Sequence, residues 1–214
     1  MALTHLRFVL LLGLFVPIPA GAAVTLREVP VRLYDTTGMA GPVRASALET
    51  ARITLAGANV PIRWMDCAAG QAVPRCATAT EAGERVLRVV RAGGPRSAGA
   101  GAAALHSPAS PLPLGDAFVD LAAGSGVLAT VYLDRITALA QVSGSSVAIL
   151  LGYAIAHEIG HLLLGTNTHG TRGLMRPVWS RDEVRRGHAA DWTFSESEMT
   201  AIRARLESMR ALAP

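Results

Sequence analysis

The alternation of apolar and polar residues predicts strands over the first two thirds of the chain. A strand that buries one face places apolar side chains at every second position, and β-branched residues favour this conformation. Turn signals such as Gly38 and Gly124 separate the segments that have this pattern. The predicted strands are VPVRLYD (29–35), NVPIRWMDC (59–67), RVLRVVR (85–91), AFVDL (117–121) and GVLATVYLD (126–134).

Helical periodicity appears after the first predicted strand and again after the last one. Within residues 43–57, one helical stripe collects the apolar side chains Val43, Ala47, Leu48, Ala51 and Leu55. Residues 135–142 have a short helical pattern. Residues 145–165, SSVAILLGYAIAHEIGHLLLG, have a long one that is apolar nearly all round. An apolar surface on every side is typical of a buried central helix.

Two further helices are predicted near the end of the chain. Ser180 with Glu183, and Ser195 with Glu198, have the spacing of a capping box, in which two side chains satisfy the first free backbone N–H groups of a helix. The second box opens a predicted helix over residues 195–212.

This order of elements predicts a single α/β domain, which we place at residues 23–214. Its upper part, residues 23–165, holds the strands, a backing helix and the central helix. Its lower part, residues 166–214, is a small helical subdomain. Residues 92–116 are rich in Ala, Gly, Ser and Pro and poor in large apolar side chains, so we expect a mobile surface loop there.

The first 22 residues have the composition of an export signal. MALTHLR carries one positive charge, FVLLLGLFVPIPA is an apolar stretch, and Ala20-Gly21-Ala22 fits a cleavage site with small residues. The stretch is short for a transmembrane helix and contains two prolines. An uncleaved anchor or a buried N-terminal helix are the alternatives. The expected product is a secreted or periplasmic protein without stable membrane insertion after cleavage.

The chain has two cysteines, Cys67 and Cys76, and both belong to the predicted mature part. An even pair at short spacing in an exported protein is typical of a disulfide that closes a small loop. The alternatives are a metal-binding pair or two buried thiols. A metal site would need further cysteines or histidines close by in sequence, and none is present.

The charge balance excludes several classes of function. The formal net charge is +4, and the arginines are scattered, without the aromatic residues that interleave basic side chains on nucleic-acid-binding surfaces. We therefore expect no nucleic-acid partner. The sequence contains no lysine, which excludes Schiff-base chemistry and a Walker-type phosphate loop.

The strongest chemical signal lies in the predicted central helix. His157 and His161 are four residues apart, so their imidazoles share one helix face and can bind one Zn²⁺. Glu158 lies on the adjoining side, where it can accept a proton from a water molecule. A chance match on a buried helix is the alternative. However, burying one Glu and two His without partners costs several kcal/mol.

The sequence identifies a third metal ligand less clearly than the first two. Gly165 can end the helix in a left-handed cap, and the polar residues after it can return His169 towards the metal. A carboxylate further along the chain, Asp182 or Glu183, is the alternative ligand. Gly173 permits a tight turn before Met175.

Residues 156–179, AHEIGHLLLGTNTHGTRGLMRPVW, resemble a metzincin-like family of exported bacterial zinc metallopeptidases. The usual metzincin pattern is H-E-x-x-H-x-x-G-x-x-H. Here the glycine and the third histidine are each displaced, which gives the longer spacing HExxHxxxGxxxH followed by GxM. A looser likeness is visible upstream, in GANVPIRWMDC and VYLDRI.

The resemblance implies a metzincin-like zincin fold with a mixed twisted sheet, a backing helix, a central zinc-binding helix and a small helical C-terminal subdomain. It also implies the roles of individual residues. His157, His161 and His169 would bind one zinc ion, Glu158 would act as the general base, and Met175 would form the methionine turn below the metal.

Together these features predict an exported, monomeric zinc metallopeptidase that hydrolyses peptide bonds in a peptide or protein. We expect the substrate to lie extended along an edge strand, for which residues 117–121 are the candidate. Two other functions use the same scaffold. One is a non-catalytic binding module stabilised by a closed zinc site, and the other is a hydrolase of a different amide linkage, such as one in the cell wall.

Overall fold

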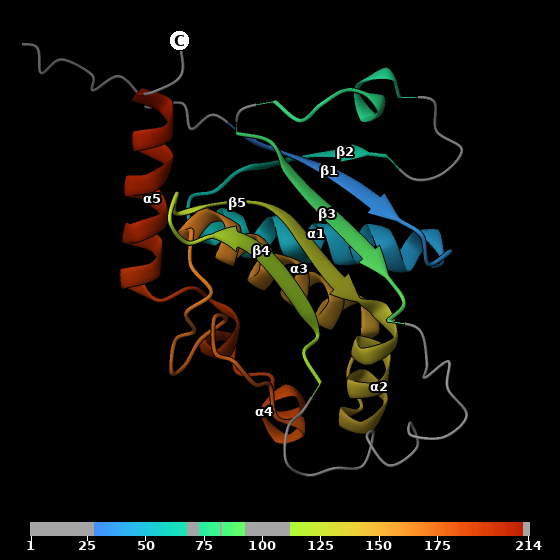
Figure 1. Cartoon of the computed structure of the whole chain (residues 1–214). Helices are drawn as coiled ribbons and strands as arrows, with labels where there is room; N and C mark the ends of the chain where they lie inside the picture. Colours follow the sequence, from blue (N-terminus) through green and yellow to red (C-terminus); the bar gives the residue numbers. More distant parts are fainter. Residues whose placement is uncertain (1–27, 68–72, 82, 93–111, 212–214) are drawn as a thin grey trace, which may run out of the picture.

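The structure is a computed structural model, and it describes residues 28–67, 73–81, 83–92 and 112–211. The predicted signal peptide and most of the predicted loop at 92–116 lie outside these residues. The described part forms a mixed α/β fold (Figure 1).

Five strands form one sheet in the order β2-β1-β3-β5-β4. The four parallel strands are β1 (Val29–Asp35), β2 (Ile62–Asp66), β3 (Arg85–Val90) and β5 (Ser125–Tyr132). β4 (Gly115–Asp120) pairs antiparallel with β5 and forms one edge. All five predicted strands are therefore confirmed, although β2 is shorter than its predicted range.

The predicted end of the loop at residue 116 is wrong. Gly115 pairs with Val131 and Asp116 pairs with Thr130, so both already belong to β4. The pairing with β5 outweighs the low strand preference of Gly and Asp at these positions.

Two helices cover one face of the sheet, α1 (Gly41–Gly57) and α3 (Val147–Leu164) (Figure 1). The core between them consists of the strand residues that face the helices together with apolar helix residues. Val31, Leu33, Leu87, Val89, Ala129 and Val131 from the strands are fully buried, as are Ala51, Leu55, Leu151 and Ile155 from the helices. α2 (Leu133–Ser143) follows β5 directly.

α3 is the predicted central helix, and it is buried along most of its length. By length and hydropathy it could cross a membrane, but 78% of it is buried inside the protein, as expected of a core helix. Ser146 caps its N-terminus by accepting a hydrogen bond from the Ile149 N–H. Gly165 ends it with φ of 62°, which confirms the predicted left-handed cap.

After α3 the chain forms a small helical part. It contains α4 (Arg181–Arg186), the 3₁₀ turn η3 (Ala189–Trp192) and α5 (Glu196–Ala211). Both predicted capping boxes are confirmed: Ser180 and Glu183 begin α4, and Ser195 and Glu198 begin α5. α5 stands beside the turn between β4 and β5 (Figure 1).

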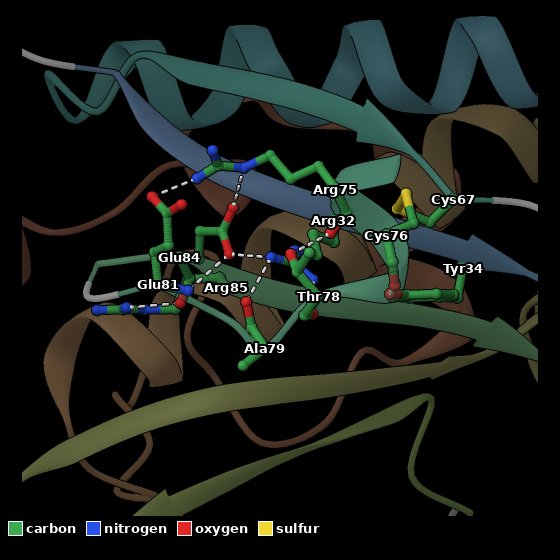
Figure 2. Close-up of polar contacts among 10 residues, drawn as sticks. All are labelled: Arg32, Tyr34, Cys67, Arg75, Cys76, Thr78, Ala79, Glu81, Glu84 and Arg85. Atoms are coloured by element: carbon green, nitrogen blue, oxygen red, sulfur yellow. Dashed lines mark hydrogen bonds and ion pairs between the residues drawn. A yellow bond between two sulfur atoms is a disulfide. The ribbon is translucent and has the colours of Figure 1, made fainter. Parts of the chain in front are cut away.

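The sheet face opposite α1 and α3 carries a buried ion pair between Arg32 of β1 and Glu84 (Figure 2). Arg32 donates to Glu84 at 2.6 Å and to the carbonyl oxygens of Thr78 and Ala79 at 2.7 and 3.0 Å. Arg75 adds a second guanidinium to Glu84, with its Nε 3.0 Å from the carboxylate. Arg75 also pairs with Glu81, so two guanidinium groups meet two carboxylates and no single charge is left unpaired where burial would make it costly.

A disulfide between Cys67 and Cys76 closes the loop that supplies Arg75, which confirms the predicted pairing (Figure 2). The hydroxyl group of Tyr34 donates to the Cys76 carbonyl oxygen at 3.1 Å and ties the loop to β1. The bridge therefore holds residues 73–81 against the sheet, over the ion pair.

Replacing both cysteines by alanine should lower the free energy of unfolding by about 2–3 kcal/mol, because the unfolded chain gains the entropy of an open loop. Urea denaturation of the oxidised parent and the double variant measures this difference. In native parent protein, neither cysteine should react with an alkylating reagent until a reductant is added. Free thiols in unreduced material would contradict the pairing.

Candidate metal centre

Three histidine side chains converge at one point beside α3. The Nε2 atoms of His157 and His161, one helical turn apart, are 3.1 Å from each other. The Nε2 of His169, which comes from the loop after the helix, is 3.3 Å from that of His161. A tetrahedral zinc with Zn–N bonds of about 2.0–2.1 Å places its ligand nitrogens roughly 3.3 Å apart. The spacing of the three imidazoles therefore suits one such ion.

Backbone carbonyl groups fix the tautomer of the two helical histidines. The Nδ1 of His157 is 2.8 Å from the Leu174 oxygen, and the Nδ1 of His161 is 2.9 Å from the Thr166 oxygen. A carbonyl oxygen only accepts, so each Nδ1 must carry the proton and donate it. In the neutral rings, both Nε2 lone pairs then face the same point with no proton between them. This is the arrangement of a metal site.

Burial keeps these rings neutral. It lowers the pKa of His157 to about 3, because the surroundings of α3 disfavour a charged imidazolium. Burial also lowers the pKa of His161 and of His169. Neutral imidazole is the form that binds a metal, so the donor set fits a divalent cation that accepts nitrogen ligands.

The longer turn after α3 does return His169 to the other two histidines. After Gly165 the chain reverses, and the Gly170 N–H donates to the Met175 oxygen at 2.9 Å. His157, His161 and His169 form a group whose ligand atoms all lie within 4.8 Å of one another. Unlike its partners, His169 is exposed, so the group is open to solvent on one side.

The two carboxylates considered as alternative ligands have other partners. Glu183 accepts hydrogen bonds from the N–H and the hydroxyl group of Ser180, at 2.9 and 2.6 Å. Asp182 pairs with Arg185 at 2.7 Å on the surface of α4. Neither belongs to the group of histidines, so the structure places His169 there instead of a carboxylate.

Met175 packs against α3 at Gly160, a residue that lies between the two helical histidines in sequence. It is fully buried, and a Cβ built on Gly160 would be only 2.8 Å from its sulfur atom. The turn before it uses Gly173 with φ of 75°, as the sequence predicts. Leu174, between these two residues, supplies the carbonyl group that orients His157. The turn therefore orients the ring of His157 through the Leu174 carbonyl group.

Glu158 is buried on the side of α3 that faces the edge strand β4. Only 6% of it is exposed, and burial, together with the charge of Asp116, raises the pKa of its carboxyl group to about 8. Its Oε1 would lie 2.6 Å from a Cβ built on Gly115. Within the described residues no hydrogen bond engages this carboxyl group.

An aromatic cluster below the histidines was not predicted as part of the site. The ring of Trp179 lies edge-on to His157 with centroids 5.8 Å apart. Trp192 packs against Trp179 and stacks on Tyr153 with centroids 4.4 Å apart. Tyr153 is therefore a packing residue of this cluster. The guanidinium group of Arg176 lies over both indoles.

The fold is similar to that of a solved protein, archaemetzincin from Methanopyrus kandleri. The two structures superpose with a TM-score of 0.50 and 15% sequence identity, over 89% of this chain and 99% of that one. No protein-family model and no curated protein sequence matches this chain. The likeness shows a metzincin-like fold, with its mixed sheet and several helices.

If the three histidines bind zinc, His169→Ala should weaken zinc binding by more than the roughly 10–100-fold typical of losing an outer-shell partner, because a direct ligand is removed. Glu183→Ala and Asp182→Ala should change the zinc affinity less than twofold. Competition with a chromophoric chelator measures these affinities. His188→Ala is the matched control, since His188 is exposed and far along the chain. The opposite ranking would assign the third position to a carboxylate.

Proposed function

We propose that this protein is a zinc-dependent peptidase with Glu158 as its general base. The observation that carries the proposal is the convergence of three imidazole nitrogens, two of them left unprotonated by the Nδ1 hydrogen bonds of their rings, next to a buried carboxyl group that has no hydrogen-bond partner among the described residues. The metzincin-like fold, shared with archaemetzincin, is consistent with it.

His157, His161 and His169 would hold the zinc ion through their Nε2 atoms. When bound, a zinc ion supplies Lewis acidity, polarising a carbonyl group and lowering the pKa of a water molecule towards neutrality. The exposed side of the group, at His169, leaves access for water and substrate. A closed structural site fills all four positions with protein ligands, whereas only three histidines converge among the described residues, which favours an enzyme over a zinc-stabilised binding module.

Glu158 would accept and then return the proton. It follows His157 directly, about 100° further round the helix, so its carboxylate points beside the histidines and does not join them. In the metal-free protein its pKa of about 8 keeps it largely protonated at neutral pH. A neighbouring cation lowers the pKa of a carboxyl group, which would make the base form available. A buried carboxylate also holds the acquired proton more tightly than a solvated one, until a leaving amine takes it.

The edge strand β4 would bind the substrate as an extended peptide. One side of β4 pairs with β5, and within the described residues no strand pairs with the other side. Free N–H and C=O groups along an edge can pair with a peptide by strand addition. Gly115, at the start of β4, contacts Glu158, so a peptide along this edge would pass beside the proposed base. Hydrolysis of a peptide bond, rather than another amide linkage, is the reaction this arrangement supports best.

We also propose that residues 1–22 direct export and that the mature protein acts as a monomer, without a nucleic-acid partner. The disulfide between Cys67 and Cys76 is consistent with a location outside the cytoplasm, where such bonds persist. The arginines are scattered along the sequence, which is not the pattern of a nucleic-acid-binding surface.

Glu158→Gln separates the enzyme from a binding module. Glutamine keeps the size of the side chain but cannot accept the proton at neutral pH. Casein or a quenched peptide library should be cleaved at least about 10²–10⁴-fold more slowly, the loss typical of removing a general base. Zinc content and melting temperature should stay near those of the parent, because Glu158 is not a ligand.

Glu207→Gln, on the exposed surface of α5, is the matched control and should leave cleavage unchanged. A parent protein that binds zinc but cleaves no peptide would support the binding module. Equal cleavage by the parent and the Glu158→Gln variant would disprove the role of Glu158.

A further inference from the structure

His169 lacks the supports that hold the other two histidines in place. His157 and His161 belong to a buried helix, and the Nδ1 of each ring donates to a backbone carbonyl group. His169 is exposed and lies in a loop, and among the described residues the hydrogen-bonding and ring-stacking partners of its ring are the other two histidines alone. Its position must therefore come from whatever fixes the backbone of residues 165–170.

The residue at the start of this loop is fixed by α5. A Cβ built on Gly165 would overlap the guanidinium group of Arg205, 2.6 Å from its Cζ, and would also overlap the Gly124 carbonyl oxygen. Gly165 is thus enclosed between α5 and the turn from β4 to β5. Figure 1 shows α5 standing beside this turn.

The residue at the end of the loop meets the same helix. A Cβ built on Gly170, next to His169, would be 2.9 Å from the Oε1 of Glu198. The other carboxylate oxygen of Glu198 accepts the Ser195 N–H at 2.7 Å, which fixes the side chain in the capping box of α5. The Glu198 side chain that contacts Gly170 is therefore already fixed by its hydrogen bond to the Ser195 N–H.

Glu198 and Arg205 act from one face of one rigid helix. They are seven residues apart, two helical turns, so their side chains project in nearly the same direction. Ile202 lies between them on this face and is fully buried, which anchors α5 in the core. The helix thus presents an acidic and a basic side chain at a fixed spacing, one to each end of the loop.

We propose that Glu198 and Arg205 are positioning residues for His169, the third ligand of the proposed metal site. The two side chains hold Gly165 and Gly170, and the short span between these glycines then has little freedom to displace the imidazole. This support replaces the Nδ1 hydrogen bond that orients the two helical histidines. The inference rests on the zinc site of the proposed function but not on hydrolysis, so a binding module would use the same device.

Glu198→Ala and Arg205→Ala should each weaken zinc binding by about 10-fold, within the range for loss of an outer-shell partner. Chelator competition with Zn²⁺ alone measures this, on the full mature chain. Glu198→Gln keeps the volume beside Gly170 and should retain most of the affinity. Glu207→Ala and Arg203→Ala, exposed on the same helix, are matched controls and should have no effect.

The decisive comparison repeats both substitutions in a His169→Ala background. If the two residues act through His169, their removal should then change zinc affinity less than twofold, because the group they position is gone. Equal losses in both backgrounds would show that α5 merely stabilises the fold, and would overturn the inference. No loss in either background would overturn it too.

Hydrogen exchange on the metal-free protein gives a readout that needs no zinc. The Gly170 N–H, bonded to the Met175 oxygen, should exchange at least about 10-fold faster in Glu198→Ala and Arg205→Ala, while amides in the middle of α3 keep their protection. Unchanged exchange at Gly170 would contradict the inference even if the parent bound no zinc. A parent that binds no zinc but shows faster exchange in both variants would refute the proposed metal site and support the positioning of the loop.

Discussion

The structure of the site depends on two hydrogen bonds that run from buried imidazoles to backbone carbonyl groups. They place the protons of His157 and His161 on Nδ1, away from the shared point, and leave two lone pairs facing each other 3.1 Å apart. Without a cation these lone pairs repel, and burial lowers the pKa of both rings, which disfavours their protonation. The fold therefore maintains an arrangement that a bound cation would stabilise.

Both carbonyl groups come from the segment after α3, so the path of that segment matters as much as the helix. The Thr166 oxygen is available because Gly165 reverses the chain, and the Leu174 oxygen because Gly173 turns it again. The same reversal brings His169 back. The segment 165–175 is thus at once the support of two imidazoles and the source of the third.

The sequence alone was sufficient for the features that are local. HExxH has helical spacing, Gly165 ends the helix, and strands such as β1 follow from alternation within a few residues. The end of the loop at 92–116 was misjudged because Gly115 and Asp116 are in a strand only through their pairing with β5. The pattern of apolar and polar residues within a segment does not show which strand that segment pairs with.

Contacts between distant segments were missed for the same reason. Gly115 of β4 meets Glu158 of α3, which packs on the sheet, and Trp192 stacks on Tyr153 from beyond α4. In the sequence alone, a glycine in a strand and a tryptophan near a helix are each compatible with many structural roles. The short motif RPVW, which follows Met175, was a partial signal, because Trp179 contacts the ring of His157 as well as the core. The resemblance named His169 as the third ligand, whereas the residues by themselves left Asp182 or Glu183 open as the alternative.

The closeness of the three histidines in sequence has a thermodynamic consequence. All lie within residues 157–169, so the unfolded chain still tethers them within reach of one another. A ligand stabilises the native state only by the difference between its affinities for the folded and unfolded chains, and metals do bind unfolded histidine-containing segments. A zinc ion held by this site would therefore raise the melting temperature by less than its affinity alone implies. The stability of the domain would then depend mainly on its hydrophobic core. The metal would contribute to catalysis more than to stability.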